Sequence, residues 1–432
     1  MGPGRERPPL PPGPWLVVGL ARSGIAAAHA LLARGEPVVA VDSGAAAPDP
    51  SALPDGLEVH LGTDGLAFLP QAGAVVKSPG VPREAPVIAA ARERGVPVLG
   101  EMELGWRLLP NEFIAVTGTN GKTTTVELLG HIHREAGLSV VVAGNVGTAL
   151  TALAGELAAA AIVVCEASSF QLEDTQAFAP EGAVLLNLES DHLDRHGTLE
   201  DYRAAKLAIF ARQGHEDIAV APFGLPVEDL GGCARRVPFG PGGELDDRAG
   251  HLWWNGEPLI AHEEIRLRGA HNRANAAAAA AIALARGIEP DAVRAGLRTF
   301  AGVEHRLEEV ARHREVLFVN DSKATNVAST LVALASFGPD ARIHLILGGQ
   351  GKDQDFTALR GRAHAIYLIG EDAERIGREA GGEHCGDLAI AVARARAGAR
   401  PGDVVLLSPA CASFDQFEDF EARGRAFRAL AG

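Results

Sequence analysis

Short apolar runs alternate along the chain with longer segments rich in alanine and leucine. Near the start, the runs from Trp15 to Gly19 and from Val38 to Asp42 predict buried strands, and the Ala-rich segment from Ile25 to Arg34 predicts a helix between them. This order predicts a βαβ unit with parallel strands. A third apolar run, Ala74 to Val76, leads into Lys77-Ser78-Pro79-Gly80. Loops after such strands are where open α/β sheets bind ligands.

The same alternation recurs twice further along the chain. In the second stretch, Phe113 to Thr117 predicts a strand and Thr123 to Ala136 a helix, and residues 215–268 carry short apolar runs between Gly, Pro and Asp that predict small β-strands. Other strands are predicted at 139–143, 161–165, 183–187, 316–319, 343–347, 365–369 and 404–407, and another helix at 273–286.

These elements predict an α/β protein of three domains. We expect a Rossmann-like N-terminal domain over residues 15–101, a central P-loop ATPase-like domain over 102–301 and a Rossmann-like C-terminal domain over 302–432. The central domain would have a mostly parallel sheet plus a small β-sheet. Residues 1–14, rich in Pro and Gly, are predicted to form a disordered tail.

Composition narrows the class of protein. A chain of 432 residues is too long for one core. The net charge of -15 argues against a nucleic-acid binder, although a phosphate-bearing small molecule remains compatible with it. No apolar run is long enough to span a membrane, and the four cysteines include no Cys-x-x-Cys pair. We therefore expect a cytoplasmic protein with no membrane insertion, and a monomer.

The first predicted βα turn has the sequence Gly19-Leu20-Ala21-Arg22-Ser23-Gly24. It differs from the dinucleotide-binding fingerprint because Ala21 stands at the position of the middle glycine, although Asp42 ends the next strand where a ribose-binding acid would lie. Two interpretations stay open. The turn binds a nucleotide-like ligand, or it only connects a strand to a helix.

A second glycine loop, Gly118-Thr119-Asn120-Gly121-Lys122-Thr123-Thr124, lies between a predicted strand and a predicted helix. Glycines let backbone N–H groups approach phosphate oxygens, and the helix N-terminus favours an anion. Lys122 would reach the β- and γ-phosphates of a nucleotide, and the Thr123 hydroxyl would ligate Mg²⁺. The loop is shorter than the Walker pattern, whose first glycine is replaced by Val116.

Ionisable residues follow two other strands. Glu166 directly follows an apolar strand that ends at Cys165 and is well placed to hold Mg²⁺ beside the glycine loop, and His192 follows the next strand. The chain has only five lysines, namely Lys77, Lys122, Lys206, Lys323 and Lys352. From its position on a short predicted helix, Lys206 is expected to be a solvated surface lysine. Two interpretations of Lys77 stay open, a place beside a loop that faces a substrate or an incidental position, and replacement by Arg is expected to be tolerated.

Several of these segments together resemble the Mur ligase family, over nearly the whole chain from about residue 15. The segments are Gly118 to Thr124, Asp191-His192-Leu193-Asp194-Arg195-His196, His271-Asn272-Arg273-Ala274-Asn275, Glu304-His305-Arg306 and Asp321-Ser322-Lys323-Ala324-Thr325-Asn326. Within that family, Glu166-Ala167-Ser168-Ser169-Phe170-Gln171-Leu172, Gly348-Gly349-Gln350-Gly351-Lys352-Asp353 and Ser408 to Phe417 resemble the D-glutamate-adding members. Ala167 departs from their pattern, in which leucine is expected.

The resemblance implies an ATP-dependent ligase that joins D-glutamate to UDP-N-acetylmuramoyl-L-alanine through an acyl phosphate, in peptidoglycan precursor synthesis. It implies ATP and two Mg²⁺ ions as cofactors. Metal ligands would be Thr123, Glu166, His192 and a Lys206 carbamylated by CO₂, and Lys122, His192 and Lys206 would be catalytic. The nucleotide would contact the glycine loop, Asn275, Arg306, Asp321 and Lys323. The substrates would contact Gly19, Ser23, Gly24, Asp42, Ser43, Ser78, Gly80, Asn145, Ser168, Gln171, Thr325, Lys352, Ser413 and Phe420.

Three alternatives stay open. Another Mur ligase or a folylpolyglutamate synthetase-like amide ligase would use a different acceptor amino acid, and the segment Ser408 to Phe417 argues for D-glutamate instead. An NAD-dependent oxidoreductase would rely on the turn from Gly19 to Gly24. A nucleotide-dependent switch protein would hydrolyse ATP or GTP without ligation.

Overall fold

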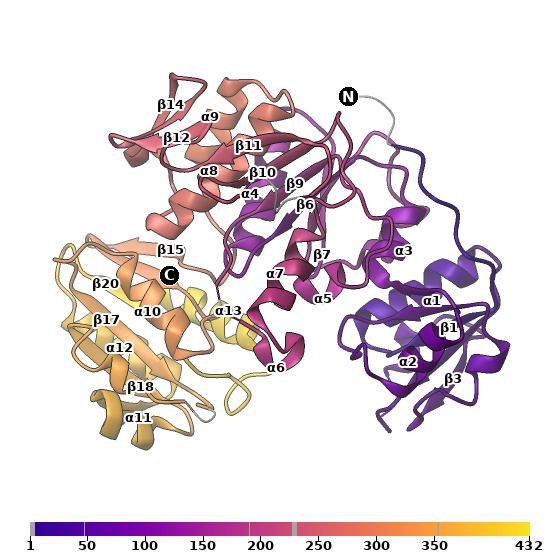
Figure 1. The fold of residues 1–432 in the computed structure, drawn as a ribbon. Helices are drawn as coiled ribbons and strands as arrows, with labels where there is room; N and C mark the ends of the chain where they lie inside the picture. The colour runs from indigo at the N-terminus through magenta and orange to yellow at the C-terminus, as the bar shows by residue number, and fades with distance from the viewer. Residues whose placement is uncertain (1–4, 47, 190, 227–230, 352–353) are drawn as a thin grey trace. The chain divides into compact units, whose positions relative to one another are not determined.

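Three β-sheets organise the chain in a computed structural model (Figure 1). The structure describes residues 5–46, 48–189, 191–226, 231–351 and 354–432. The chain divides into two compact units. Unit 1 comprises Met1–Glu264 with Ala274–Arg298, and unit 2 comprises Ile265–Arg273 with Thr299–Gly432. The first two sheets lie in unit 1 and the third in unit 2.

The first sheet is parallel and has the strand order β3-β2-β1-β4-β5. Alternate residues of its central strand point to opposite faces. Trp15 and Val17 pack in one apolar cluster with Leu104 of α3, whereas Leu16 packs in the other with Ile88 of α2. The elements are β1 (Trp15–Val18), α1 (Arg22–Ala33), β2 (Val38–Asp42), β3 (Glu58–Leu61), β4 (Ala74–Lys77), α2 (Pro86–Glu93), β5 (Val98–Gly100) and α3 (Glu101–Leu108).

The second sheet has the order β14-β13-β12-β11-β10-β9-β6-β8-β7. It is parallel from β7 to β12 and ends in an antiparallel meander from β12 to β14, so the expected small strands extend the main sheet. The strands are β6 (Phe113–Thr117), β7 (Val140–Gly144), β8 (Ile162–Glu166), β9 (Gly182–Leu185), β10 (Ile218–Pro222), β11 (Arg235–Phe239), β12 (Leu245–Arg248), β13 (His251–Trp254) and β14 (Glu257–Ala261). The helices are α4 (Lys122–Glu135), α5 (Ser169–Leu172), α6 (Leu193–His196), α7 (Leu199–Leu207), α8 (Ala270–Ala285) and α9 (Pro290–Thr299).

The third sheet has the order β15-β16-β20-β17-β18-β19, with β15 antiparallel and the other strands parallel. Leu345 and Leu347 of β17 pack in one apolar cluster with residues of α10 and α11, and Ile346 packs in the other with residues of α12 and α13. The elements are β15 (Glu308–His313), β16 (Val316–Asn320), α10 (Val327–Ala335), β17 (Ile343–Gly348), β18 (Ala365–Ile369), α11 (Ala373–Ala380), β19 (Glu383–Gly386), α12 (Leu388–Gly398), β20 (Val404–Leu407) and α13 (Phe420–Ala431).

These three mostly parallel sheets confirm the predicted α/β class. The predicted boundaries near residues 101 and 301 stay predictions. Among the described residues, no helix has the length and apolar character needed to cross a membrane.

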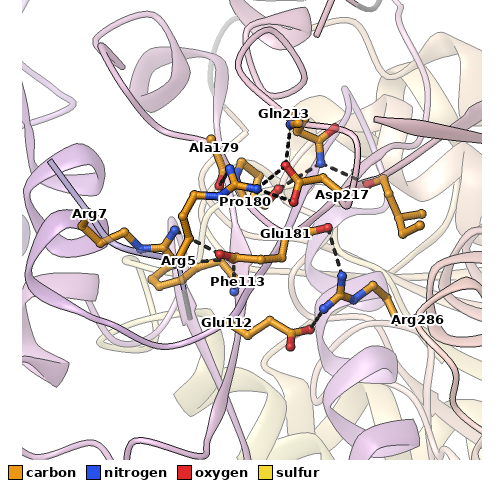
Figure 2. Close-up of polar contacts among 12 residues, drawn as sticks. Arg5, Arg7, Glu112, Phe113, Ala179, Pro180, Glu181, Gln213, Asp217 and Arg286 are labelled. Carbon is orange, nitrogen blue, oxygen red and sulfur yellow. Dashed lines mark hydrogen bonds and ion pairs between the residues drawn. The ribbon is translucent and has the colours of Figure 1, made fainter. Parts of the chain in front are cut away.

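The prediction of a disordered tail is wrong for residues 5–14. Arg5 Nη2 lies 2.6 Å from Asp217 Oδ1, and Arg7 Nη1 lies 3.0 Å from Glu181 Oε1 (Figure 2). The Arg7 guanidinium also lies 4.5 Å from the centroid of the Trp106 ring. We call residues 5–12 the N-terminal strap. The Pro-rich composition gave no signal for it, because its order comes from two arginines meeting carboxylates far along the chain. Residues 1–4 lie outside the described part.

Candidate active site

The glycine loop connects β6 to α4 as predicted. Gly118 and Gly121 have φ values of +156° and +86°, which other residues rarely adopt. A Cβ on Gly121 would lie 2.1 Å from Asn275 Oδ1, so the loop packs directly against the start of α8. The ammonium of Lys122 donates hydrogen bonds to the carbonyls of Gly118 and Thr119, each at 2.9 Å. A cation therefore lies within the loop, where phosphate groups would bind.

Thr123 and Glu166 meet beside this loop. The Thr123 hydroxyl donates to Glu166 Oε2 at 2.8 Å, and Asn145 Nδ2 donates to Oε1 at 2.9 Å. Strand pairing explains the meeting, because Glu166 is the residue of β8 that pairs with Val116 of β6. A hydroxyl and a carboxylate at the start of a glycine-loop helix suit Mg²⁺, a hard cation that prefers oxygen ligands. The residues present therefore fit one such ion.

Lys206 is not the solvated lysine that its helix suggested. The residue is 2% exposed, and its ammonium donates to the Gly118 carbonyl at 2.8 Å, the same oxygen that Lys122 contacts. The ammonium also lies 4.7 Å from the Tyr202 ring centroid. Burial and the neighbouring Lys122 ammonium lower the pKa of the Lys206 amine from 10.5 to about 7, against the opposite pull of Asp191 and Glu166.

His192 lies in a strained backbone conformation, with φ at +49°. Its side chain is 49% exposed, and its ring lies 5.0 Å from that of Phe170. The neighbouring His196 is more enclosed, with Nε2 3.0 Å from Ser169 Oγ and its ring stacked on Phe170. Among the described residues, no group of three or more His, Cys, Asp or Glu side chains is spaced to hold a metal. A second ion at His192 thus stays a prediction.

In the first domain, the turn after β1 is built by close backbone contacts. A Cβ on Gly24 would lie 1.8 Å from the Gly19 carbonyl oxygen, and the Ser78 hydroxyl donates to that same oxygen at 2.8 Å. Asp42 accepts hydrogen bonds from the backbone N–H groups of Leu20 and Gly44, at 2.6 and 2.7 Å. These contacts bring Ser78 and Asp42 to the turn. Ser23 lies half-buried in α1, and Ser43 and Gly80 are exposed.

Ser168 and Gln171 form a capping box at the start of α5. The Ser168 hydroxyl accepts from the Gln171 N–H at 3.3 Å, and Gln171 Oε1 accepts from the Ser168 N–H at 3.0 Å. Both predicted substrate residues therefore have a structural task directly after Glu166. A binding task for them stays a prediction.

In unit 2, Asp321 is a buried acid, and Asn326 caps the helix α10 that follows it. The Ser408 hydroxyl donates to Asp321 Oδ2 at 2.8 Å, and the Leu307 N–H donates to Oδ1 at 3.2 Å. Burial raises the pKa of the Asp321 carboxyl to about 7, although these two hydrogen bonds and the charge of Arg306 oppose the rise.

Lys323 and Phe420 form a cation–π contact, with the ammonium 3.7 Å from the ring centroid. Phe420 is thus brought to the predicted nucleotide side of unit 2. Ser413 is 2% exposed, and its carbonyl accepts from the N–H groups of Gln416 and Phe417 at 3.1 and 2.8 Å. Thr325 lies two residues after Lys323 and is half-buried. The predicted acceptor-site residue Lys352 lies outside the described residues.

Three family models match the chain: "Mur ligase MurD-like, N-terminal domain" over residues 14–100, "Mur ligase middle domain" over 116–230 and "Mur ligase, glutamate ligase domain" over 305–411. The chain belongs to the Mur ligase family. It is therefore an ATP-dependent ligase that forms an amide bond, and not an oxidoreductase or a switch protein.

Similar proteins include the UDP-N-acetylmuramoylalanine--D-glutamate ligase of Anaeromyxobacter dehalogenans, which is 45% identical over 96% of each chain. The ligase of the same name from Rubrobacter xylanophilus is 43% identical over 96% of this chain and 98% of its own. The fold is similar to that of UDP-N-acetylmuramate-alanine ligase from Thermotoga maritima, with a TM-score of 0.59, 19% identity and coverage of 96% and 98%. It also resembles a MurF ligase from the same organism, solved with ADP, with a TM-score of 0.58, 17% identity and coverage of 98% and 95%.

Proposed function

We propose that this protein joins D-glutamate to the carboxyl group of UDP-N-acetylmuramoyl-L-alanine, with ATP converted to ADP and phosphate. The observation that carries the proposal is the cluster around the Gly118 carbonyl, where Lys122 and Lys206 meet next to the Thr123–Glu166 pair. The two relatives described above, at 45% and 43% identity, both have names that specify this reaction.

The cluster suits phosphoryl transfer to a carboxylate. That reaction brings anions together, so cations must neutralise the developing charge. Lys122 would neutralise the phosphates from within the loop. Thr123 and Glu166 would hold Mg²⁺, which supplies positive charge at the phosphate oxygens when bound. Asn145 orients the Glu166 carboxylate by its hydrogen bond to Oε1.

Lys206 would act as a carbamate. A carbamate forms when a neutral amine reacts with CO₂. A lysine can therefore become a carbamate only where part of its amine is unprotonated. The burial of Lys206 beside another ammonium supports this reactivity. The product would be an anion close to Lys122, with His192 as a further ligand of a second Mg²⁺.

Unit 2 would make further nucleotide contacts and bind the acceptor amino acid. The nucleotide contacts would include Arg306, Asp321, Lys323 and Asn275. Thr325, Lys352, Ser413 and Phe420 would form the D-glutamate site. Two carboxylates on D-glutamate need hydrogen-bond donors, and an ammonium and a hydroxyl supply them. The turn from Gly19 to Gly24, with Asp42, Ser43, Ser78 and Gly80, would contact the uridine diphosphate part of the other substrate.

The reaction would occur in the cytoplasm, as a step in building peptidoglycan precursors for cell-wall growth and cell division. Phosphate release tests it, with UDP-N-acetylmuramoyl-L-alanine, ATP, Mg²⁺ and a panel of amino acids. Among the amino acids, we expect only D-glutamate to give phosphate release. Leaving out either the uridine substrate or D-glutamate should give none. Release with L-lysine or L-alanine in place of D-glutamate would contradict the proposed acceptor. Nucleotide hydrolysis that ignores both substrates would contradict ligation itself.

A further inference from the structure

Arg423 of α13 is a buried cation with no task in the function proposed above. The residue is 1% exposed and is among the largest fully buried side chains of the described chain. Among the described residues, no carboxylate oxygen lies within 4.0 Å of its guanidinium. A buried charge is costly unless it is paired or well hydrogen-bonded, so its contacts need an explanation.

The guanidinium joins two loops at the predicted binding side of unit 2. Nε donates to Ser322 Oγ and Nη2 to the Ser322 carbonyl, both at 2.9 Å. Nη2 also donates to the Cys411 carbonyl at 3.0 Å, and Nη1 to the Ala412 carbonyl at 3.3 Å. Ser322 lies between Asp321 and Lys323 in what we call the nucleotide-side loop, residues 321–325. Cys411 and Ala412 precede Ser413 in what we call the acceptor-side loop, residues 408–413.

A third segment packs against the same point. Gly349 has a φ of +131°, and a Cβ there would lie 2.2 Å from the Ala412 carbonyl oxygen and 3.3 Å from Arg423 Nη1. The next residue, Gln350, exchanges two backbone hydrogen bonds with Ala412, each at 3.0 Å. The segment that leads to Lys352 is therefore fixed to the acceptor-side loop directly beside Arg423.

Phe420 is tied to the same network. The Ser322 hydroxyl donates to the Phe420 carbonyl at 2.8 Å while it accepts from Arg423 Nε. The ring of Phe420 in turn lies under the Lys323 ammonium. Arg423 thus contacts the nucleotide-side loop and the acceptor-side loop directly. It reaches Phe420 through one residue, Ser322.

Only arginine has the shape for this set of contacts. Its planar fork donates in several fixed directions, whereas the donors of lysine radiate from a single nitrogen. Burial lowers the pKa of Arg423 to about 10, so the side chain stays charged at neutral pH. The hydrogen bonds of this buried cation stabilise the fold and at the same time fix the two loops relative to each other.

We propose that Arg423 is a positioning residue that fixes the acceptor-side loop relative to the nucleotide-side loop, so that the donors for D-glutamate are preorganised. The naming of the two sides rests on the proposed function. The contacts themselves do not. Preorganised donors lower the entropy cost of binding, so loss of the fork weakens acceptor binding first. The uridine substrate would bind through unit 1 and is unaffected.

The test compares Arg423→Lys and Arg423→Met with Arg425→Lys, a change at an exposed arginine of the same helix. In phosphate release, we expect Arg423→Lys to raise the KM for D-glutamate by about ten-fold or more, the size that loss of a charge-assisted hydrogen bond gives. The KM for UDP-N-acetylmuramoyl-L-alanine should change by less than about two-fold, within the scatter of surface substitutions. Arg425→Lys should match the wild type.

Hydrogen exchange on the full-length protein without substrates gives a second measurement. The amides of Lys323 and Ala412 donate to the carbonyls of His305 and Gln350, and both should exchange faster in Arg423→Lys and Arg423→Met. Unchanged exchange at both amides, or an unchanged KM for D-glutamate, would overturn the positioning role. If the wild type does not use D-glutamate but exchange still rises in the variants, the proposed function fails and the positioning role stands.

Discussion

The ammonium of Lys77 lies 2.6 Å from Asp174 Oδ2, and the two side chains are 0% and 1% exposed. The pair joins the end of β4, a strand of the first sheet, to the segment between α5 and β9. The Val81 carbonyl accepts from Lys77 Nζ at 2.8 Å and from Arg195 Nη2 at 2.9 Å. The loop that contains Ser78 and Gly80 is therefore held at both ends. Asp174, which follows α5, binds Lys77 before the loop, and Arg195 of α6 binds the Val81 carbonyl after it.

This contact changes the expectation for Lys77, whose role was open from the sequence alone. Removing one partner of a buried ion pair costs about 3–5 kcal/mol. We expect Lys77→Met to lower the free energy of unfolding by about that amount, measured by urea denaturation, with Arg94→Met at an exposed site as control. Lys77→Arg should also destabilise, because a fully buried site has no space for the larger guanidinium. Wild-type stability in Lys77→Met would show that Arg92, 3.1 Å from Asp174, is a sufficient partner.

Lys206 should respond to substitution through its amine and not only through its charge. With a pKa of about 7, about half of the amine is neutral at pH 7, so reaction with CO₂ is available there. We expect Lys206→Arg to abolish ligation, because a guanidinium stays protonated and forms no carbamate. Lys206→Ala should regain part of its activity when short carboxylates are added.

Two measurements separate this chemistry from simple loss of structure. The carbamate should appear as a ¹³C resonance when the protein is kept in ¹³C-bicarbonate, and it should be missing in Lys206→Arg. Because the folded-state pKa is depressed, the unfolded chain binds more protons between about pH 7 and 10.5, and the stability of the wild type should rise across that range. Equal losses in both variants without any rescue would contradict the carbamate.

Glu166 should be needed for metal use more than for folding. Glu166→Gln keeps the size of the side chain and can still accept from Thr123, but it removes the negative charge that would hold Mg²⁺. We expect kcat to fall by at least about a hundred-fold and the Mg²⁺ concentration for half-maximal activity to rise. Glu156→Gln, at an exposed position, is the matched control. An unchanged Mg²⁺ requirement would indicate that residues other than Glu166 bind the ion.

Asp321 should carry a stability cost that depends on pH. Its pKa of about 7 lies above the ordinary 3.8, so the folded state binds more protons than the unfolded chain between these values. Stability from this group is therefore full at low pH and is lost as pH rises toward 7. We expect Asp321→Asn to be more stable than the wild type at pH 8 by on the order of 1 kcal/mol and nearly equal at pH 4, in urea denaturation. Its ligase activity should still fall, since the carboxylate would contact the nucleotide. A less stable variant at pH 8 would show that hydrogen bonds outweigh burial.

The sequence revealed the parts of the site that are local. The loop from Gly118 to Thr124 was predictable because strand, glycines and helix follow one another directly. Glu166 was predictable because it directly follows an apolar strand. The burial of Lys206 was not, since its partner Gly118 is 88 residues away and its own helix looks solvated. Arg423 gave no signal at all, because its contact with Ser322 spans 101 residues and arginine is common in this chain.

The N-terminal strap has a consequence for the order in which the molecule is completed. The partner of Arg5, Asp217, is made 212 residues later, and Glu181 follows Arg7 by 174 residues. Domains fold as units during synthesis, starting from the N-terminal end. The first sheet can therefore form while the strap still has no binding site. Docking of the strap must wait until β9 and β10 have assembled, so the strap is made before the first sheet but reaches its final contacts after that sheet can form.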